Sequence, residues 1–239
     1  MSNILKPNNQ RSKNAITLIW IVMAAEMLSL ASGFLQYDLL QTVLNGEEIS
    51  QEAADYNDLR EQIIGLVYLV VYVTSAVTFI QWFRRAYFNL QQMVKHLSYD
   101  DGWAAGCWFV PIVSIYRPFQ IMKELYVETK ELLNKHVDQL SASGRSLVER
   151  INTSTLGWWW AFWLLTNLSG QFTFRYSVSA ESIEELITST TTSMALNLLG
   201  LPLGFLAIKV VHDYSLMEPL LLEIKPLDAE NQNVDGSVS

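Results

Sequence analysis

The chain has 239 residues, of which 50% are hydrophobic and 17% are charged, and its formal net charge is −8. An acidic chain lacks the basic footprint of a nucleic-acid-binding protein. A single Cys excludes an intrachain disulfide and any CxxC metal or redox pair. Three His residues leave little for a zinc site, so we expect neither a metal nor a cofactor. Composition alone does not separate a soluble protein from a membrane protein.

The apolar residues gather in four long runs, which follow one another along the chain. They cover residues 15–37, 62–83, 156–174 and 193–212. As helices rising 1.5 Å per residue, runs of about 20 residues cross a hydrocarbon core of about 30 Å. A soluble α-domain of this size rarely holds four helices uncharged on all sides. We therefore predict an all-α integral membrane four-helix bundle rather than a soluble domain with four core helices.

A fifth apolar run, residues 103–116, is shorter and contains Pro111. Runs of about 10–14 residues are more often interfacial, re-entrant or buried than membrane-spanning. A fifth span would also export the basic residues that follow it, from Arg117 to Arg150. We therefore predict that this run dips into the inner leaflet or lies on it, as part of a cytoplasmic insertion between the second and third spans.

Lys and Arg mark the cytoplasmic side of a membrane protein. Residues 1–14 hold three of them and residues 84–155 hold nine, whereas 38–61 and 175–192 hold one each. We therefore predict an inner (plasma) membrane protein with both termini in the cytoplasm, a basic N-terminus at 1–14, and an acidic tail at 215–239 that is partly disordered from Asp228. A cleaved signal peptide is the alternative for the first run, but the run is long for one.

The middle of the predicted cytoplasmic insertion contains an amphipathic pattern. Residues 118–138 place apolar side chains three and four apart, which is typical of a helix with one apolar stripe. Pro118 suits the first turn of such a helix. The stripe could pack inside the protein, lie on the membrane surface or bind a partner, and we favour packing. Residues 141–144 (SASG) are predicted to form a short linker.

Four blocks of residues stand out in a fixed order. They are FIQWFRRA at 79–86 with NL at 89–90, GWAAGCWFVP at 102–111, RP at 117–118 with MKEL at 122–125, and WWW at 158–160 with Trp163. In order and spacing they resemble a bacterial membrane family, domain of unknown function 4328, over about Ala15 to Tyr214. The resemblance implies a four-span membrane protein without an assigned activity. Cys107 and Ser114 stand where the pattern leads us to expect Gly and Asn. The residues of the family-motif loop are Gly102, Trp103, Gly106, Trp108, Pro111, Arg117 and Pro118.

Glu26 lies eleven residues into the first run and is the sharpest candidate for a functional side chain. A carboxyl at that depth costs a few kcal/mol or more and should face the bundle interior with partners. Tyr72 on the second span and Asn167 on the third lie at similar depth, and each could donate a hydrogen bond. Glu26 is therefore either a proton or cation relay or a buried acid that sets helix register, and we favour the second.

Other motifs point to packing and to lipid. Gly200 and Gly204 form a GxxxG pattern around Pro202, which allows close helix approach and a kink. A helix broken there could line an ion site, but a packing kink is the simpler interpretation. Residues 158–160 fit an aromatic belt at the membrane interface. Arg84, Arg85 and Lys95 are candidates for contacts with anionic lipid headgroups, although a role in setting orientation also suffices for them.

No motif of a known catalytic site is present. HExxH, GxxxxGK[ST] and GxSxG are absent, and Cys107 with His96 and Asp100 would make only a weak triad. We therefore expect a non-enzymatic membrane protein, an assembly, scaffolding or regulatory subunit that acts through its cytoplasmic insertion. Its partners would be the lipid bilayer and a protein or a second copy, not nucleic acid. The alternative is a small transporter or channel component that uses Glu26 and the Pro202 kink, with an intramembrane enzyme third.

Overall fold

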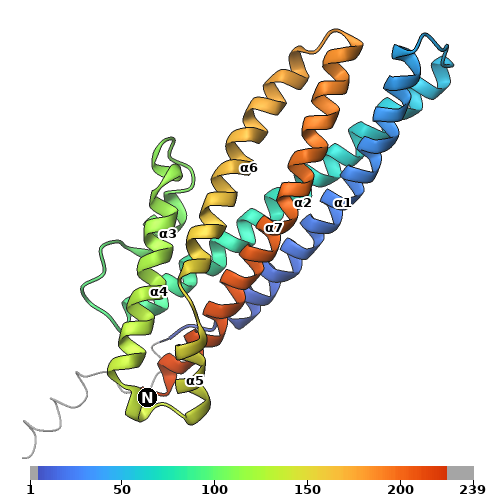
Figure 1. Ribbon diagram of the computed structural model, residues 1–239. Coiled ribbons are helices and arrows are strands. Elements are labelled where there is room, and N and C mark those ends of the chain that lie inside the picture. The colour runs from blue at the N-terminus through green and yellow to red at the C-terminus, as the bar shows by residue number, and fades with distance from the viewer. Residues whose placement is uncertain (1–4, 225–239) are drawn as a thin grey trace, which may run out of the picture. The chain divides into compact units, whose positions relative to one another are not determined.

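The computed structural model describes residues 5–224, and every regular element in that range is a helix (Figure 1). The α-helices are α1 (Asn9–Leu44), α2 (Gln51–Gln91), α3 (Asp101–Gly106), α4 (Arg117–Lys135), α5 (Ala142–Arg150), α6 (Ser154–Ser179) and α7 (Ile183–Met217). Short 3-10 helices are η1 (Val113–Ile115), η2 (Val137–Gln139) and η3 (Glu218–Leu222). The predicted all-α class is confirmed for the described residues.

The chain forms two compact units, and each is described by itself. Unit 1 comprises Met1–Lys13, Phe79–Leu156 and Val210–Ser239, and unit 2 comprises Asn14–Thr78 and Gly157–Lys209. Unit 1 groups end segments of α1, α2 and α7 with α3, α4 and α5. The predicted membrane domain over 15–214 stays a prediction. Asp228 and the rest of the predicted disordered tail lie outside the described residues.

Three helical segments in the described part are long and apolar enough to cross a membrane. They are Asn9–Leu44, Gln51–Gln91 and Ile183–Leu222, which contain three of the four predicted spans. Helix α6 contains the remaining run, and its 26 residues are long enough, but it is not one of the three. Polar Asn167 and Gln171 lower the mean hydropathy of its apolar run. The fourth span therefore stays a prediction.

The long helices extend beyond the predicted spans. Helix α1 continues to Leu44 and α2 starts at Gln51, so only residues 45–50 connect them. Gly46 supplies the positive φ of 83° that this turn needs. Residues 180–182 likewise join α6 to α7. Short connections of this kind join antiparallel neighbouring helices.

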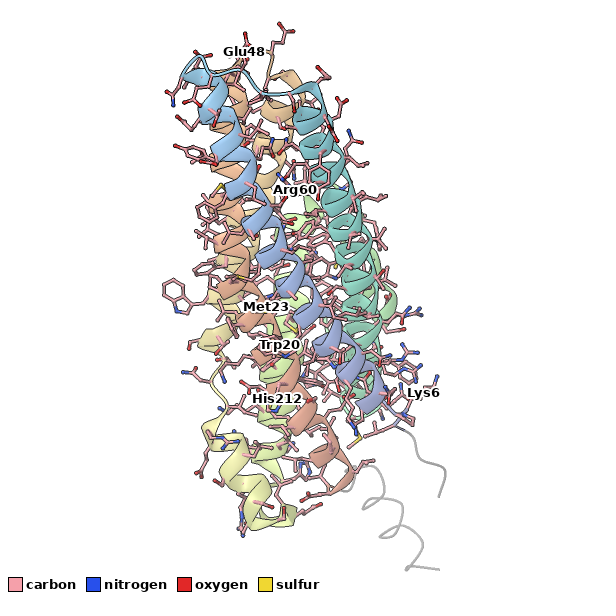
Figure 2. The ribbon with its side chains drawn as sticks, turned by 90° about the vertical axis from the view of Figure 1, so that its right-hand side faces the viewer. Lys6, Trp20, Met23, Glu48, Arg60 and His212 are labelled. Carbon is pink, nitrogen blue, oxygen red and sulfur yellow. The ribbon has the colours of Figure 1, made fainter. Side chains whose placement is uncertain are left out.

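Helices α1 and α7 of unit 2 approach closely at three glycines. An added Cβ at Gly204 would lie 2.6 Å from Met23 Cγ, and one at Gly33 would lie 2.8 Å from Met194 Cγ. Gly200 faces Glu26 in the same way. Trp20, which precedes Met23 on α1 by about one turn (Figure 2), meets Phe205 edge to face with centroids 5.5 Å apart. Gly200 and Gly204 of the GxxxG pattern therefore lie on a face of α7 that α1 side chains approach closely.

A polar cluster joins α1 to α2 in the same unit. The Arg60 guanidinium donates from Nε to Ser32 Oγ at 2.9 Å and from Nη2 to Asn57 Oδ1 at 2.6 Å. Ser32 Oγ also donates to Glu61 Oε1, which lies 3.3 Å from Arg60 Nη2. Each of these four side chains therefore has a hydrogen-bond partner, and together they link the two helices. We call this cluster the Arg60 clamp.

Unit 1 has an aromatic core. Trp82, Tyr126 and Tyr214 are fully buried or nearly so, and Tyr214 packs with both of the others at centroid distances of 6.1 and 5.4 Å. The Tyr126 hydroxyl donates to the carbonyl of Val210. The α4 stripe is buried, which confirms the expected packing of the amphipathic helix; its buried members are Pro118, Ile121, Met122, Leu125, Tyr126, Thr129 and Leu133.

A buried carboxylate ties both ends of the described chain into unit 1. Glu218 accepts hydrogen bonds from Asn89 Nδ2 at 2.7 Å and from Asn8 Nδ2 at 2.9 Å. Asn89 also pairs with the backbone of Lys6 in both directions, at 2.9 and 2.8 Å. The sequence assigned residues 215–224 to the tail. In the structure these residues are largely helical, and several of their side chains are buried.

The predicted linker at 141–144 is wrong. Ser141 is the N-cap of α5, and its side chain accepts a hydrogen bond from the Gly144 N–H at 3.2 Å. Ser followed by small residues fits an N-terminal helix cap as well as a linker, and the cap is what forms.

The glycine packing generates a first prediction. Gly204→Ala should lower the free energy of unfolding by about 1 kcal/mol, the lower end for overpacking, because flexible Met23 must move. Gly170→Ala on α6, where a Cβ meets nothing within 4 Å, should cause no loss. Unfolding in mixed detergent measures both variants, and equal behaviour of the two would contradict the packing.

Candidate functional site

The carboxyl of Glu26 is the clearest unsatisfied polar group in unit 2. The residue is 7% exposed, and its Oε2 has no hydrogen-bond partner among the described residues. Burying such a group without a partner costs free energy. Groups of this kind in a native fold call for a ligand, a water or a mechanism to explain them.

Glycine at position 200 makes room for this carboxyl. An added Cβ there would collide with Glu26 Oε1 and would lie 2.6 Å from Oε2, so both oxygens lie directly against the α7 backbone. We call this space the Gly200 notch. Pro202 follows within α7, which remains one helix across it. The alternative of a helix broken at Pro202, which the sequence analysis did not favour, is therefore not what forms, although Pro202 has no N–H to give to the preceding turn.

The predicted partners of Glu26 lie near each other. The Tyr72 hydroxyl lies near the Asn167 side chain, and Asn167 Nδ2 donates to the Trp163 carbonyl at 2.9 Å. Neither satisfies Glu26 Oε2. Both Tyr68 and Tyr72 lie within electrostatic reach of the Glu26 carboxyl. Sequence reasoning missed Tyr68, although its position one helical turn before Tyr72 would have placed it on the same face.

This arrangement offers one carboxyl, two phenol oxygens and an amide. In the described part of the chain, no group of three or more His, Cys, Asp or Glu could hold a metal ion. Of these groups, the carboxyl is the one that can hold or release a proton near neutral pH.

The family-motif loop in unit 1 begins with a capped short helix. Asp100 Oδ1 accepts from the Trp103 N–H at 2.8 Å and caps α3. An added Cβ at Gly102 would lie 3.0 Å from that oxygen, so glycine leaves room for the cap. Arg84 Nε pairs with Asp101 Oδ2 at 2.8 Å, which ties the start of α3 to α2.

The loop ends in an exposed apolar tip, residues 109–116. Trp108 packs edge to face on Phe79 at 5.9 Å, and its Nε1 donates to the Ala104 carbonyl at 3.2 Å. Beyond it, Phe109 and Ile112 are 75% and 74% exposed. Ile112 has φ 67° and ψ −49°, and the Val113 N–H donates to the Pro111 carbonyl at 2.7 Å. This is a strained γ-turn with a β-branched residue at its centre.

Arg117 fixes the far side of the loop. Its Nη1 donates to Tyr99 Oη at 2.8 Å and to Gln120 Oε1 at 3.2 Å. The guanidinium also lies over the rings of Tyr99 and Tyr116, at 5.1 and 5.3 Å from the centroids. Gly106 has open space around it, and Pro118 is buried at the start of α4. These motif residues therefore shape the loop.

The structure does not assemble the weak triad. His96 Nε2 lies 2.9 Å from Glu128 Oε2, and Asp100 is occupied with its helix cap. Cys107 is fully buried, and burial raises the pKa of its thiol to about 11. A buried, protonated thiol is a poor nucleophile.

The predicted headgroup-binding residues have different environments. Arg84 is paired with Asp101, as described above. Arg84 and Arg85 both lie within electrostatic reach of Arg11, and Arg85 within reach of Glu218. Lys95 is exposed. The sequence analysis did not identify Arg11 as part of this group of basic residues. Its Nη1 donates to the Gln81 carbonyl at 3.0 Å.

Comparison with known proteins gives one match. A family model described as Domain of unknown function (DUF4328) matches residues 45–215, which is more than half of the chain. The match begins after α1, so the predicted resemblance from Ala15 is confirmed only from residue 45. No curated protein and no solved structure matches the chain.

Proposed function

The chain belongs to the DUF4328 family, and we propose that it is a multi-pass inner-membrane protein without enzymatic activity, an assembly, scaffolding or regulatory subunit that acts through cytoplasmic residues 84–155. One observation carries this proposal. The apolar part of α2 in unit 2 is largely exposed in the protein, whereas unit 1 has a closed aromatic core. Exposed apolar helices of this length require lipid.

The spans in this proposal are α1, α2, α6 and α7. Helix α6 is included because only residues 180–182 join it to α7, and because its 26 residues measure about 39 Å at 1.5 Å per residue. The distribution of Lys and Arg favours cytoplasmic termini. Residues 38–61 and 175–192 are then the segments outside.

The tip at 109–116 dips into the inner leaflet in this proposal. Asp101 at the start of α3 pairs with Arg84, just after the second predicted span. Trp108 contacts Phe79, inside that span. From Asp101 to Trp108 the chain therefore runs along α2 in the direction of the predicted hydrocarbon core. The exposed side chains of Phe109 and Ile112 follow Trp108.

Contacts with a protein partner would use a polar surface, because the α4 stripe is buried within unit 1. Exposed charged residues on the outer faces of α4 and α5 include Lys123, Lys135, Arg145 and Glu149. A second candidate function, a small transporter or channel component, is favoured by the unpartnered oxygen of Glu26.

Cysteine labelling tests the threading. In a Cys107→Ala background, a membrane-impermeant maleimide should label a cysteine at Glu48 from outside intact cells. A cysteine at Ser143 should react only after the cells are opened. One at Ile112 should resist on both sides, because lipid covers it. Labelling of position 143 from outside would contradict the threading, and rapid labelling of position 112 in opened cells would contradict the dip.

Affinity capture in a gentle detergent tests the scaffold role. A partner that binds the exposed charged residues of α4 and α5 should no longer be captured by the double variant Lys135→Glu with Arg145→Glu. The control Arg175→Glu, which reverses an exposed charge on α6, should retain it. Capture of nothing by the wild-type protein, or equal loss from both variants, would contradict the role.

A further inference from the structure

We infer that Glu26 and the Gly200 notch form an intramembrane site for a monovalent cation, H⁺ or Na⁺. The inference rests on the membrane location of unit 2 proposed above, and it gives a ligand class to the second candidate function. Every residue that it uses lies in unit 2.

The first support is the unsatisfied oxygen. Glu26 is more than nine-tenths buried, and its Oε2 has no partner among the described residues. Two other buried polar side chains of the same unit, Ser32 and Asn57, are both bonded within the Arg60 clamp. The unit therefore satisfies buried polar groups elsewhere, and Glu26 is left with bonding capacity for a ligand.

The second support comes from the neighbouring glycine. One turn along α7, Gly204 opens an equivalent space on the same face, and there the α1 side chain that enters it is Met23. An apolar side chain thus suffices to fill such a notch and to pack the two helices. Packing alone does not require the carboxyl at position 26.

The third support is the surrounding chemistry. Tyr68 and Tyr72 bring phenol groups within electrostatic reach of the carboxyl, and oxygen is the ligand that hard cations prefer. One carboxylate and one monovalent cation sum to zero charge, whereas a divalent ion would leave an uncompensated charge in a low-dielectric site. The described part of the chain offers no cluster of acidic, His or Cys ligands for a divalent ion. The charge balance therefore favours a monovalent cation, and the experiment below tests H⁺ and Na⁺.

Carbodiimide labelling of the purified full-length protein tests the site. A hydrophobic carbodiimide reacts with a protonated carboxyl, and mass spectrometry locates the adduct. We expect labelling at Glu26 that speeds up as pH falls. If the site binds Na⁺, a Na⁺ concentration ten times its Kd should slow labelling about tenfold relative to the same concentration of choline. About nine in ten sites are then occupied by Na⁺, and only the rest can react. Labelling that depends on pH but not on Na⁺ assigns the site to H⁺ alone.

Two variants provide controls. Glu26→Gln should lose the adduct and keep its fold. Gly200→Ala must displace the carboxyl and should weaken protection by Na⁺ or shift the pH profile, whereas Gly170→Ala should match the wild type. Thermal unfolding supplies a second readout: the midpoint of the wild type should change with Na⁺ or pH more than that of Glu26→Gln.

A clear negative result overturns the inference. It is overturned if labelling at Glu26 is absent or indifferent to pH and Na⁺, and the unfolding midpoints of wild type and Glu26→Gln respond alike. Carbonate extraction separates this failure from that of the proposed function. A protein that stays in the membrane after extraction but fails these tests loses only the cation site, whereas one that is released loses the membrane role as well.

Discussion

Close approach of α1 to α7 is the constraint on which the arrangement of unit 2 depends. In lipid, two apolar helices gain nothing from the hydrophobic effect when they meet, so van der Waals packing between small residues must hold them. Gly33, Gly200 and Gly204 provide that contact. The same approach brings the Glu26 carboxyl against the α7 backbone, so helix packing and the chemistry of the site have one origin.

Local sequence patterns predicted the features that depend on one segment at a time. Run length and hydropathy predicted four spans, three of which lie in helices long and apolar enough to cross a membrane. Three-and-four spacing predicted the buried stripe of α4. The position of Glu26 inside an apolar run predicted its burial. The GxxxG pattern predicted a packing surface because small residues have that effect wherever a helix carries them.

Contacts between distant segments could not be predicted in this way. Nothing local pairs Glu26 with Gly200, and depth along a span led us to Tyr72 and Asn167, neither of which bonds to the unpartnered oxygen of Glu26. Glu218 lies 129 residues from Asn89 and 210 from Asn8, and only the folded chain shows that both amides bind it. Ser141 was misjudged because a cap and a linker use the same residues.

The two units handle buried carboxyl groups differently. In unit 1, Glu218 is held by two amides and fixes the ends of the described chain. In unit 2, Glu26 keeps an oxygen without a partner. A fully bonded acid is suited to a fixed structural role, whereas one with spare bonding capacity is suited to exchange a ligand.

Infrared difference spectroscopy of the wild type against Glu26→Gln in lipid tests the central claim most directly. The account predicts a carboxylic C=O band that is present only in the wild type and shifts in D₂O. That band should convert to carboxylate absorption when Na⁺ is added or the pH is raised. A band that stays unchanged in D₂O, across pH and in Na⁺ would show a sealed structural acid and contradict the account.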